Sequence, residues 1–246
     1  METASYIALS RQTALRRQLE VTANNIANMN TTAFKAERML FVEYLNGPGG
    51  AGSAPTGHEV SMVNDQAVVR DFTAGAIEHT GNPFDVAIDG PGFLVVDTAG
   101  GPRYTRSGRL HLDGEGRIVD ANGLAVLDVN DQPLTVPANV TQIEIDGDGN
   151  VTSEAGPIGT LRIVEFDDSF GLTPLGGGLY VTNELPKEAE ASNLIQGAVE
   201  GSNVQPIVEM TQMIEISRTY QSIQNFIQSE HERLQQANRQ LSDIKA

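Results

Sequence analysis

An acidic turn near the middle of the chain has the spacing that comes closest to a known chemical site. Asp146, Asp148 and Asn150 place oxygen donors at the first, third and fifth positions of a calcium-binding loop. The sixth position is Val151, where the loop needs glycine, and the twelfth is Pro157, where a bidentate glutamate belongs. We therefore expect a tight turn here and no calcium site.

Two glycine-rich segments lack the residues that nucleotide binding requires. Residues 176–178 are three glycines with no Lys-Ser or Lys-Thr after them, so they do not form a phosphate-binding loop. Residues 90–92 lack the third glycine of a dinucleotide-binding fingerprint and lead into an expected strand instead of a helix. Neither segment predicts a cofactor site.

Side chains that could support catalysis or hold a metal do not occur at the necessary spacing. Asp168-Ser169 falls in an expected turn without an evident base, and no G-x-S-x-G elbow is present. The histidines are too far apart in the sequence to suggest a metal site. We expect no enzyme activity, no metal and no cofactor. The four histidines are His58, His79, His111 and His231.

Arg103, Arg106 and Arg109 form the one basic cluster in the acidic middle of the chain. We expect these arginines to pair with local carboxylates, and a contact with an acidic neighbouring subunit is the alternative. The local carboxylates are Asp113, Glu115 and Asp120.

The chain of 246 residues has a formal net charge of −16 and contains no cysteine. Residues 36–200 hold 25 acidic and 8 basic residues, whereas residues 1–35 and 201–246 are nearly neutral. Such an acidic body repels the phosphates of nucleic acid, so we expect no nucleic-acid partner. We also expect no membrane-spanning segment and no cleaved signal peptide, because no long apolar run and no basic stretch before an apolar run is present.

The C-terminal region carries apolar residues at alternating steps of three and four, which is a heptad pattern interrupted only by Glu230. The pattern spans roughly 47 Å at 1.5 Å per residue, which exceeds the diameter of a small domain. A helix of this length needs another helix to cover it, either from the same chain or from neighbours. The pattern residues are Met213, Ile216, Tyr220, Ile223, Ile227, Leu234, Ala237, Leu241 and Ile244.

The N-terminal region shows the same alternation less strongly. Three asparagines within it are poor helix formers, so we expect their amides to bridge to neighbouring backbones, and ordinary fraying of the helix is the alternative for each of them. With the C-terminal set, these positions predict an assembly surface. The alternating positions are Leu15, Leu19, Thr22, Ile26, Met29 and Ala33, and the asparagines are Asn24, Asn25 and Asn28.

These patterns predict an α+β chain, in which N- and C-terminal helices form a coiled-coil-like helical domain around an inserted antiparallel all-β domain. We expect the first helix over 5–29, and the last from between Asn203 and Pro206 to about 240, capped by Ser202 or Asn203. The predicted domains are 1–35 with 202–246, a connector over 36–80 with a flexible loop at 46–57, and the β domain over 81–201. Short strands are expected at 85–88, 93–97, 109–112, 118–120, 125–128, 142–145 and 161–166.

Four segments together give the chain a resemblance to the flagellar axial proteins that build rod and hook. Within that family the start of the chain, Gly92-Phe-Leu and the segment 200–204 are similar to proximal-rod members, with a distal-rod member as the alternative. One departure is Ala33, where the family usually has glycine, which would cost roughly 1 kcal/mol if the backbone there is left-handed. The four segments are 21–35, 85–96, 104–127 and 197–221.

The resemblance implies a structural subunit of the basal-body rod, exported by the flagellar type III apparatus and located where the rod crosses the periplasm. Its implied partners are other copies and other axial proteins, which its terminal helices would contact, while the β domain forms an outer layer. Two other classes stay open: an acidic binding module with an oligomerising helical stalk, and a hydrolase whose catalytic groups the sequence does not reveal.

Overall fold

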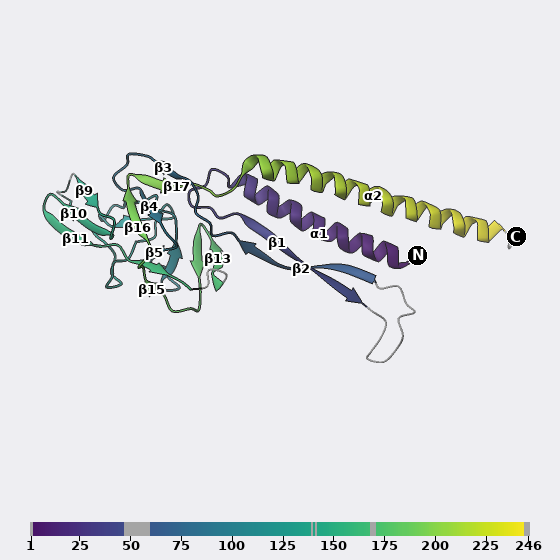
Figure 1. The fold of residues 1–246 in the computed structure, drawn as a ribbon, viewed down its shortest axis with the longest axis horizontal. Helices are drawn as coiled ribbons and strands as arrows, with labels where there is room; N and C mark the ends of the chain where they lie inside the picture. Colours follow the sequence, from purple (N-terminus) through teal and green to yellow (C-terminus); the bar gives the residue numbers. More distant parts are fainter. Residues whose placement is uncertain (1, 47–59, 139, 141, 168–170, 244–246) are drawn as a thin grey trace. The chain divides into compact units, whose positions relative to one another are not determined.

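The computed structural model describes residues 2–46, 60–138, 140, 142–167 and 171–243, and within them the chain forms two compact units. The helical unit comprises Met1–Ala27, Glu37–Val69 and Gln205–Ala246, and the β unit comprises Asn28–Ala36 and Arg70–Val204. The chain is thus α+β, with a largely antiparallel β region inserted between an N-terminal and a C-terminal helix (Figure 1).

Helix α1 (Glu2–Ala27) ends two residues before the predicted boundary. Asn28 begins a turn in which its carbonyl and its side-chain oxygen accept bonds from the N–H and the hydroxyl of Thr31, at 3.1 Å each. Local bonds of this kind compete with helix continuation. The prediction that Met29 and Ala33 continue the helical pattern is therefore wrong, and Ala33 instead has a φ of 56°.

Helix α2 (Pro206–Asp243) starts with the proline that the sequence placed in its first turn, where the missing N–H leaves no unmet bond. The predicted cap is wrong. The Asn203 side chain accepts a bond from the N–H of Ala36 and donates to the carbonyl of Asp71, while the hydroxyl of Ser202 accepts from the N–H of Val204. These side chains organise the segment before the helix. Ile244, the last residue of the predicted heptad pattern, lies outside the described residues.

Strands β1 (Glu37–Asn46) and β2 (Val60–Arg70) pair into a two-stranded ribbon within the segment that the sequence analysis treated as a connector. The predicted loop over 46–57 lies outside the described residues, except for Asn46. A two-stranded ribbon is marginal alone, so it needs another element to pack against. That element is α1, which β1 contacts.

The β unit contains a six-stranded sheet in the order β13-β14-β6-β5-β12-β15, a three-stranded sheet β11-β10-β9 and the pairs β16-β4, β17-β3 and β7-β8. All the pairings described within these sheets are antiparallel, as predicted. The strands are β3 (Ile77–His79), β4 (Val86–Asp89), β5 (Phe93–Val96), β6 (Arg103–Thr105), β7 (His111–Leu112), β8 (Ile118–Val119), β9 (Ile143–Ile145), β10 (Asn150–Ser153), β11 (Gly156–Thr160), β12 (Ile163–Glu165), β13 (Thr173–Gly176), β14 (Leu179–Val181), β15 (Lys187–Glu188), β16 (Asn193–Gln196) and β17 (Ala198–Glu200).

The expected strand at 125–128 forms isolated bridges instead of a regular strand. Val126 bridges to Val96, and Asp128 bridges to Leu161. Its side chains are nevertheless buried in part, with Val126 fully covered.

Strand β5 separates two apolar cores, because successive side chains of a strand point to opposite faces. Leu94 and Val96 belong to a large aliphatic core, whereas Phe93 and Val95 belong to a smaller core that includes several aromatic rings. The ring of Phe93 lies 5.8 Å from that of Tyr180, close to perpendicular. Such edge-to-face pairs stabilise beyond the area they bury.

Candidate assembly surface

The two helices form an antiparallel pair within the helical unit. Figure 1 shows α1 and α2 side by side, with the C-terminal end of α2 extending past the N-terminal end of α1. This overhang follows from their lengths, which are 26 residues for α1 and 38 for α2. At 1.5 Å per residue the difference is roughly 18 Å of helix.

The residues of the predicted heptad pattern, which we call the seam of α2, form the most covered side of that helix. Ile216 is buried, with 5% of its surface exposed, and Met213, Tyr220, Ile223 and Ile227 are half-buried. The spacing of three and four therefore identified the face that packs against α1. Further along, Leu234 is 39% exposed. Leu241 lies within the helical backbone, but its side chain is outside the described residues.

The inner side of α1 uses small residues as well as the predicted ones. Ala8 and Ala14 are buried, and Leu15, Leu19 and Ile26 are half-buried. Alanine at the contact lets neighbouring backbones approach closely, which sequence reasoning missed because alanine gives a weak apolar signal.

The asparagines of α1 differ in their roles. Asn25 is buried and forms two reciprocal 2.9 Å bonds with the backbone of Glu37, one through its amide N–H and one through its oxygen. This is the predicted bridge to a neighbouring backbone, and it fixes the start of β1 beside α1. Asn24 donates to the Glu37 carboxylate at 3.3 Å. Asn28 and Met29 lie beyond the helix and are half-buried in the β unit.

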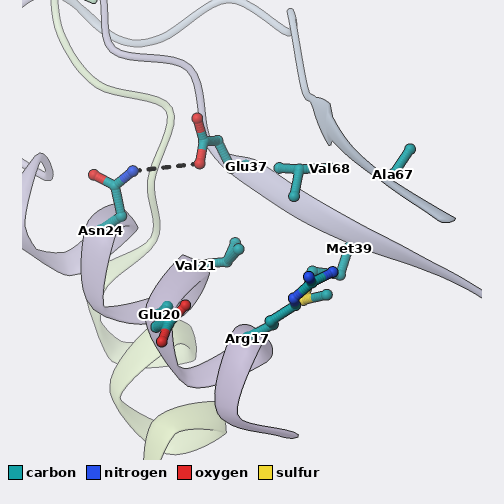
Figure 2. A pocket seen from close by; sticks show the side chains of 8 residues that line it. All are labelled: Arg17, Glu20, Val21, Asn24, Glu37, Met39, Ala67 and Val68. Carbon is teal, nitrogen blue, oxygen red and sulfur yellow. Dashed lines mark hydrogen bonds between the residues drawn. The ribbon is translucent and has the colours of Figure 1, made fainter. Parts of the chain in front are cut away.

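A pocket of about 390 Å³ lies between α1 and the β1–β2 ribbon (Figure 2). In that view a hydrogen bond joins two of the residues that line the pocket, Asn24 of α1 and Glu37 of β1. The lining mixes apolar side chains with charged ones, which suits a partner surface with an apolar anchor and a polar border. The lining residues are Arg17, Glu20, Val21, Asn24, Glu37, Met39, Ala67 and Val68.

A second apolar set lies on the side of α2 that faces away from its seam. Ile207, Met210 and Ile214 are spaced by three and four residues, so they share one helix face. They are 82%, 47% and 54% exposed. This set was not predicted, because the heptad pattern indicates a single apolar stripe on the helix.

An ionic network is buried in the β unit, and it corrects the expectation for the arginine cluster. Arg106 Nε donates to Glu200 Oε2 at 2.9 Å, and Lys35 Nζ donates to Glu200 Oε1 at 2.6 Å. Lys35, Arg106 and Glu200 are each at most 2% exposed. Arg106 also donates to the carbonyls of Gly90 and Gly92. Pairing of Arg106 with a local carboxylate is therefore wrong.

The expected carboxylate partners bind elsewhere. Asp113 and Glu115 both pair with Arg117, and Arg103 donates to the carbonyls of Gly100 and Pro102. No local sequence pattern indicates the buried network, because its three members are widely separated along the chain.

Opposing effects act on the titration of the buried network. Burial alone would raise the pKa of Glu200, but the charges of Arg106 and Lys35 outweigh it, so the pKa lies below its usual range. Burial lowers the pKa of Lys35, and the charge of Glu200 offsets this only in part. The carboxylate is therefore held in its charged form between two cations.

The acidic turn after β9 has the predicted structure. Asp146 Oδ1 accepts bonds from the N–H groups of Asp148 and Asn150 at 3.0 and 2.9 Å, and Gly149 has a φ of 85°. The bond that the Asn150 side chain donates is the main cause of a lowered pKa for Asp146. The carboxylate is thus used to close the turn.

Within the described parts of the chain, no group of three or more His, Cys, Asp or Glu side chains could hold a metal ion. His79, His111 and His231 lie on β3, β7 and α2, and His58 is outside the described residues. None of the helices in the described residues has the length and apolar character needed to cross a membrane.

The fold defines a class of α+β chains in which the two ends of the sequence meet in one helical unit and the middle folds as an antiparallel β unit. Three family models match the chain, one near its start, one in its middle and one near its end. Residues 6–35 match the flagella basal body rod protein model, 87–153 the flagellar hook protein FlgE/F/G D1 domain, and 195–240 the flagellar basal body rod FlgEFG protein C-terminal model.

Relatives match over nearly the whole chain. The flagellar basal-body rod protein FlgF of Caulobacter vibrioides is 38% identical over 99% of this chain and all of its own length. FlgF of Rhizobium meliloti is 33% identical over 91% of each chain, and the rod protein FlgG of Bacillus subtilis is 32% identical over 94% of this chain and 96% of its own. The chain therefore belongs to the flagellar basal-body rod protein family.

Proposed function

We propose that this chain is a structural subunit of the proximal part of the flagellar rod, and that it assembles through its terminal helices into the shaft that transmits torque. The observation that carries the proposal is the full-length similarity to FlgF at 38% identity. A subunit of the distal rod is the second candidate, and the similarity to FlgG supports it. An acidic binding module with an oligomerising stalk does not account for the matches of residues 6–35 and 195–240 to the rod protein family models.

The proposed assembly surface combines the seam, the overhang of α2 and the neighbourhood of the pocket. Figure 1 shows the C-terminal end of α2 extending past α1, and Leu234 in the C-terminal part of α2 is 39% exposed, so α2 offers apolar surface there to a neighbouring subunit. The exposed set at Ile207, Met210 and Ile214 adds a second side on which neighbours can pack. A coiled-coil-like arrangement with helices of neighbouring subunits would bury both.

In the proposal the two units have different roles. The helical unit contributes to an inner layer, which residues 1–35 and 202–246 were predicted to form, and the acidic β unit contributes to an outer layer. The uneven charge supports this division, because near-neutral ends can pack closely while a strongly acidic surface stays solvated. The partners are other copies and other axial proteins, and none of the proposed contacts involves nucleic acid or catalysis.

Localisation follows the same proposal. The subunit would pass through the flagellar type III export apparatus and fold where the rod crosses the periplasm. Helices that need neighbours to cover an apolar stripe gain order on arrival, because assembly offsets the entropy cost of ordering them.

Deletion of the gene in its native cell, followed by electron microscopy of purified basal bodies, tests the proposal. We expect rods truncated near the inner membrane, restored by the full chain and not by chains lacking residues 1–33 or 207–246. Intact rods in the deletion strain would contradict a rod subunit, and rods truncated far from the inner membrane would favour the distal position.

Point variants test the assembly surface more finely. Leu19→Asp or Ile223→Asp should block incorporation into the rod and abolish motility, because each places a charge in the half-buried seam. Gln221→Asp, at an exposed position two residues from Ile223, is the matched control and should support motility. Normal motility of both seam variants would exclude the seam from assembly.

A further inference from the structure

The buried ionic network connects parts of the β unit that are far apart in the sequence. Lys35 and Glu200 are separated by 165 residues, and Arg106 and Glu200 by 94. Asn203 ties the same two ends of the unit together, because its side-chain oxygen accepts a 2.7 Å bond from the N–H of Ala36. Closure of the network therefore requires the start and the end of the unit to be in place at once.

Among the described residues, Glu200 is the carboxylate that contacts both buried cations. Its Oε1 also accepts a 2.9 Å bond from the N–H of Gly75. A β unit that compacted without Glu200 would bury Lys35 and Arg106 without this counter-charge, and an uncompensated buried charge is strongly destabilising. Each partly folded state that lacks the last strand is therefore penalised.

Glu200 is also the last of the three network residues along the chain. It ends β17, which pairs with β3, whereas Lys35 and Arg106 belong to the start and the middle of the unit. Since a chain is synthesised from its N-terminus, both cations are present long before their anion. Contacts of such large sequence separation also form slowly, because loop-closure entropy must be overcome first.

We propose that Glu200 is a latch that makes folding of the β unit wait for the last β strand, and so prolongs the unfolded state of a newly made chain. The benefit of this delay rests on the proposed function, in which the chain is exported before it folds. The folding kinetics that test the latch do not depend on that function, so either idea can fail without the other.

Refolding of the full-length Glu200→Gln chain tests the latch, since glutamine keeps the size and the acceptor oxygen but removes the charge. We expect refolding of the β unit, followed by near-ultraviolet circular dichroism of its aromatic core after dilution from denaturant, to be at least tenfold slower than in the wild-type chain. Glu188→Gln removes an exposed carboxylate from the same unit and should change the rate less than twofold.

A second variant keeps the test decisive if Glu200→Gln does not refold. Adding Lys35→Met to Glu200→Gln removes one of the two uncompensated cations and should restore refolding or accelerate it at least threefold. A Glu200→Gln chain that refolds within twofold of wild type and only unfolds faster would overturn the proposal, because Glu200 would then join after the rate-limiting step. A double variant no faster than the single one would overturn it as well.

Discussion

Ala33 occupies a backbone conformation that disfavours a side chain. Its φ of 56° lies in the left-handed region, its N–H donates to the carbonyl of Glu200 at 2.7 Å, and it is buried, so the surroundings hold it in place. The resemblance to the axial proteins had marked this position as one where glycine is usual, and the structure gives the physical reason.

Ala33→Gly should raise the free energy of unfolding of the β unit by about 1 kcal/mol, because glycine adopts this conformation without a Cβ penalty. Ala36→Gly is the matched control. Ala36 is also buried but lacks a positive φ, so glycine there should lower stability by about 0.5–1 kcal/mol. Denaturant unfolding followed by near-ultraviolet circular dichroism measures both, and equal effects of the same sign would contradict the argument.

The carboxylate of Asp146 gives a pH-dependent prediction. The bonds that it accepts lower its folded-state pKa below its unfolded value, so its contribution to stability is present above the unfolded pKa and is lost as the pH falls through the folded pKa. Asp146→Asn should therefore be less stable than wild type at neutral pH, and the difference should shrink below about pH 4. A difference that does not vary between pH 7 and pH 3 would contradict this account.

Two isoleucines of α2 that are only two residues apart differ in burial. Ile216 lies in the seam and is buried, whereas Ile214 lies on the opposite side and is exposed. Ile216→Ala should destabilise the helical unit by about 2–3 kcal/mol, since Ile216 is buried against the helix pair. Ile214→Ala should change stability by less than about 0.5 kcal/mol, because Ile214 is exposed. Thermal unfolding at a helix-sensitive wavelength measures both, and similar losses would mean that the seam is not the packed face.

Close backbone contacts explain one glycine of the β unit. A Cβ added at Gly108 would lie 1.6 Å from the carbonyl oxygen of Val86, whereas one at Gly114 would meet nothing within 4 Å. Gly108→Ala should cost about 3 kcal/mol or more, because the strand β4 would have to move. Gly114→Ala should be nearly neutral in the same denaturant titration, and a folded, fully stable Gly108→Ala chain would refute the close contact.

Elements with strong local signals were predictable from the sequence. The heptad pattern located the covered face of α2, Pro206 marked its start, and Asp-Gly pairs such as Asp146-Gly147 marked turns. The ribbon was missed, because β1 is stabilised by its contact with α1 and β2 by its pairing with β1, and not by a clear alternation of their own. The end of α1 was misplaced because the turn at Asn28 overrides a pattern that continues to Met29.

At the scale of the whole molecule, the sequence could predict class and family but not the long-range contacts. The network of Lys35, Arg106 and Glu200 is formed by residues up to 165 positions apart, and neither periodicity nor spacing relates them. The same holds for Asn203, which was expected to cap a helix and instead holds the segment at Ala36. Contacts between residues so far apart in the sequence become visible only in the folded structure.

We propose that the terminal helices place this subunit in the proximal rod. Cryo-electron microscopy of basal bodies purified from the native cell tests it most directly, with the described helices and β unit fitted to the rod density. We expect α1 and α2 to lie in the inner wall of the rod nearest the inner membrane, packed against helices of neighbouring subunits. A complete rod whose density excludes this chain would contradict the claim.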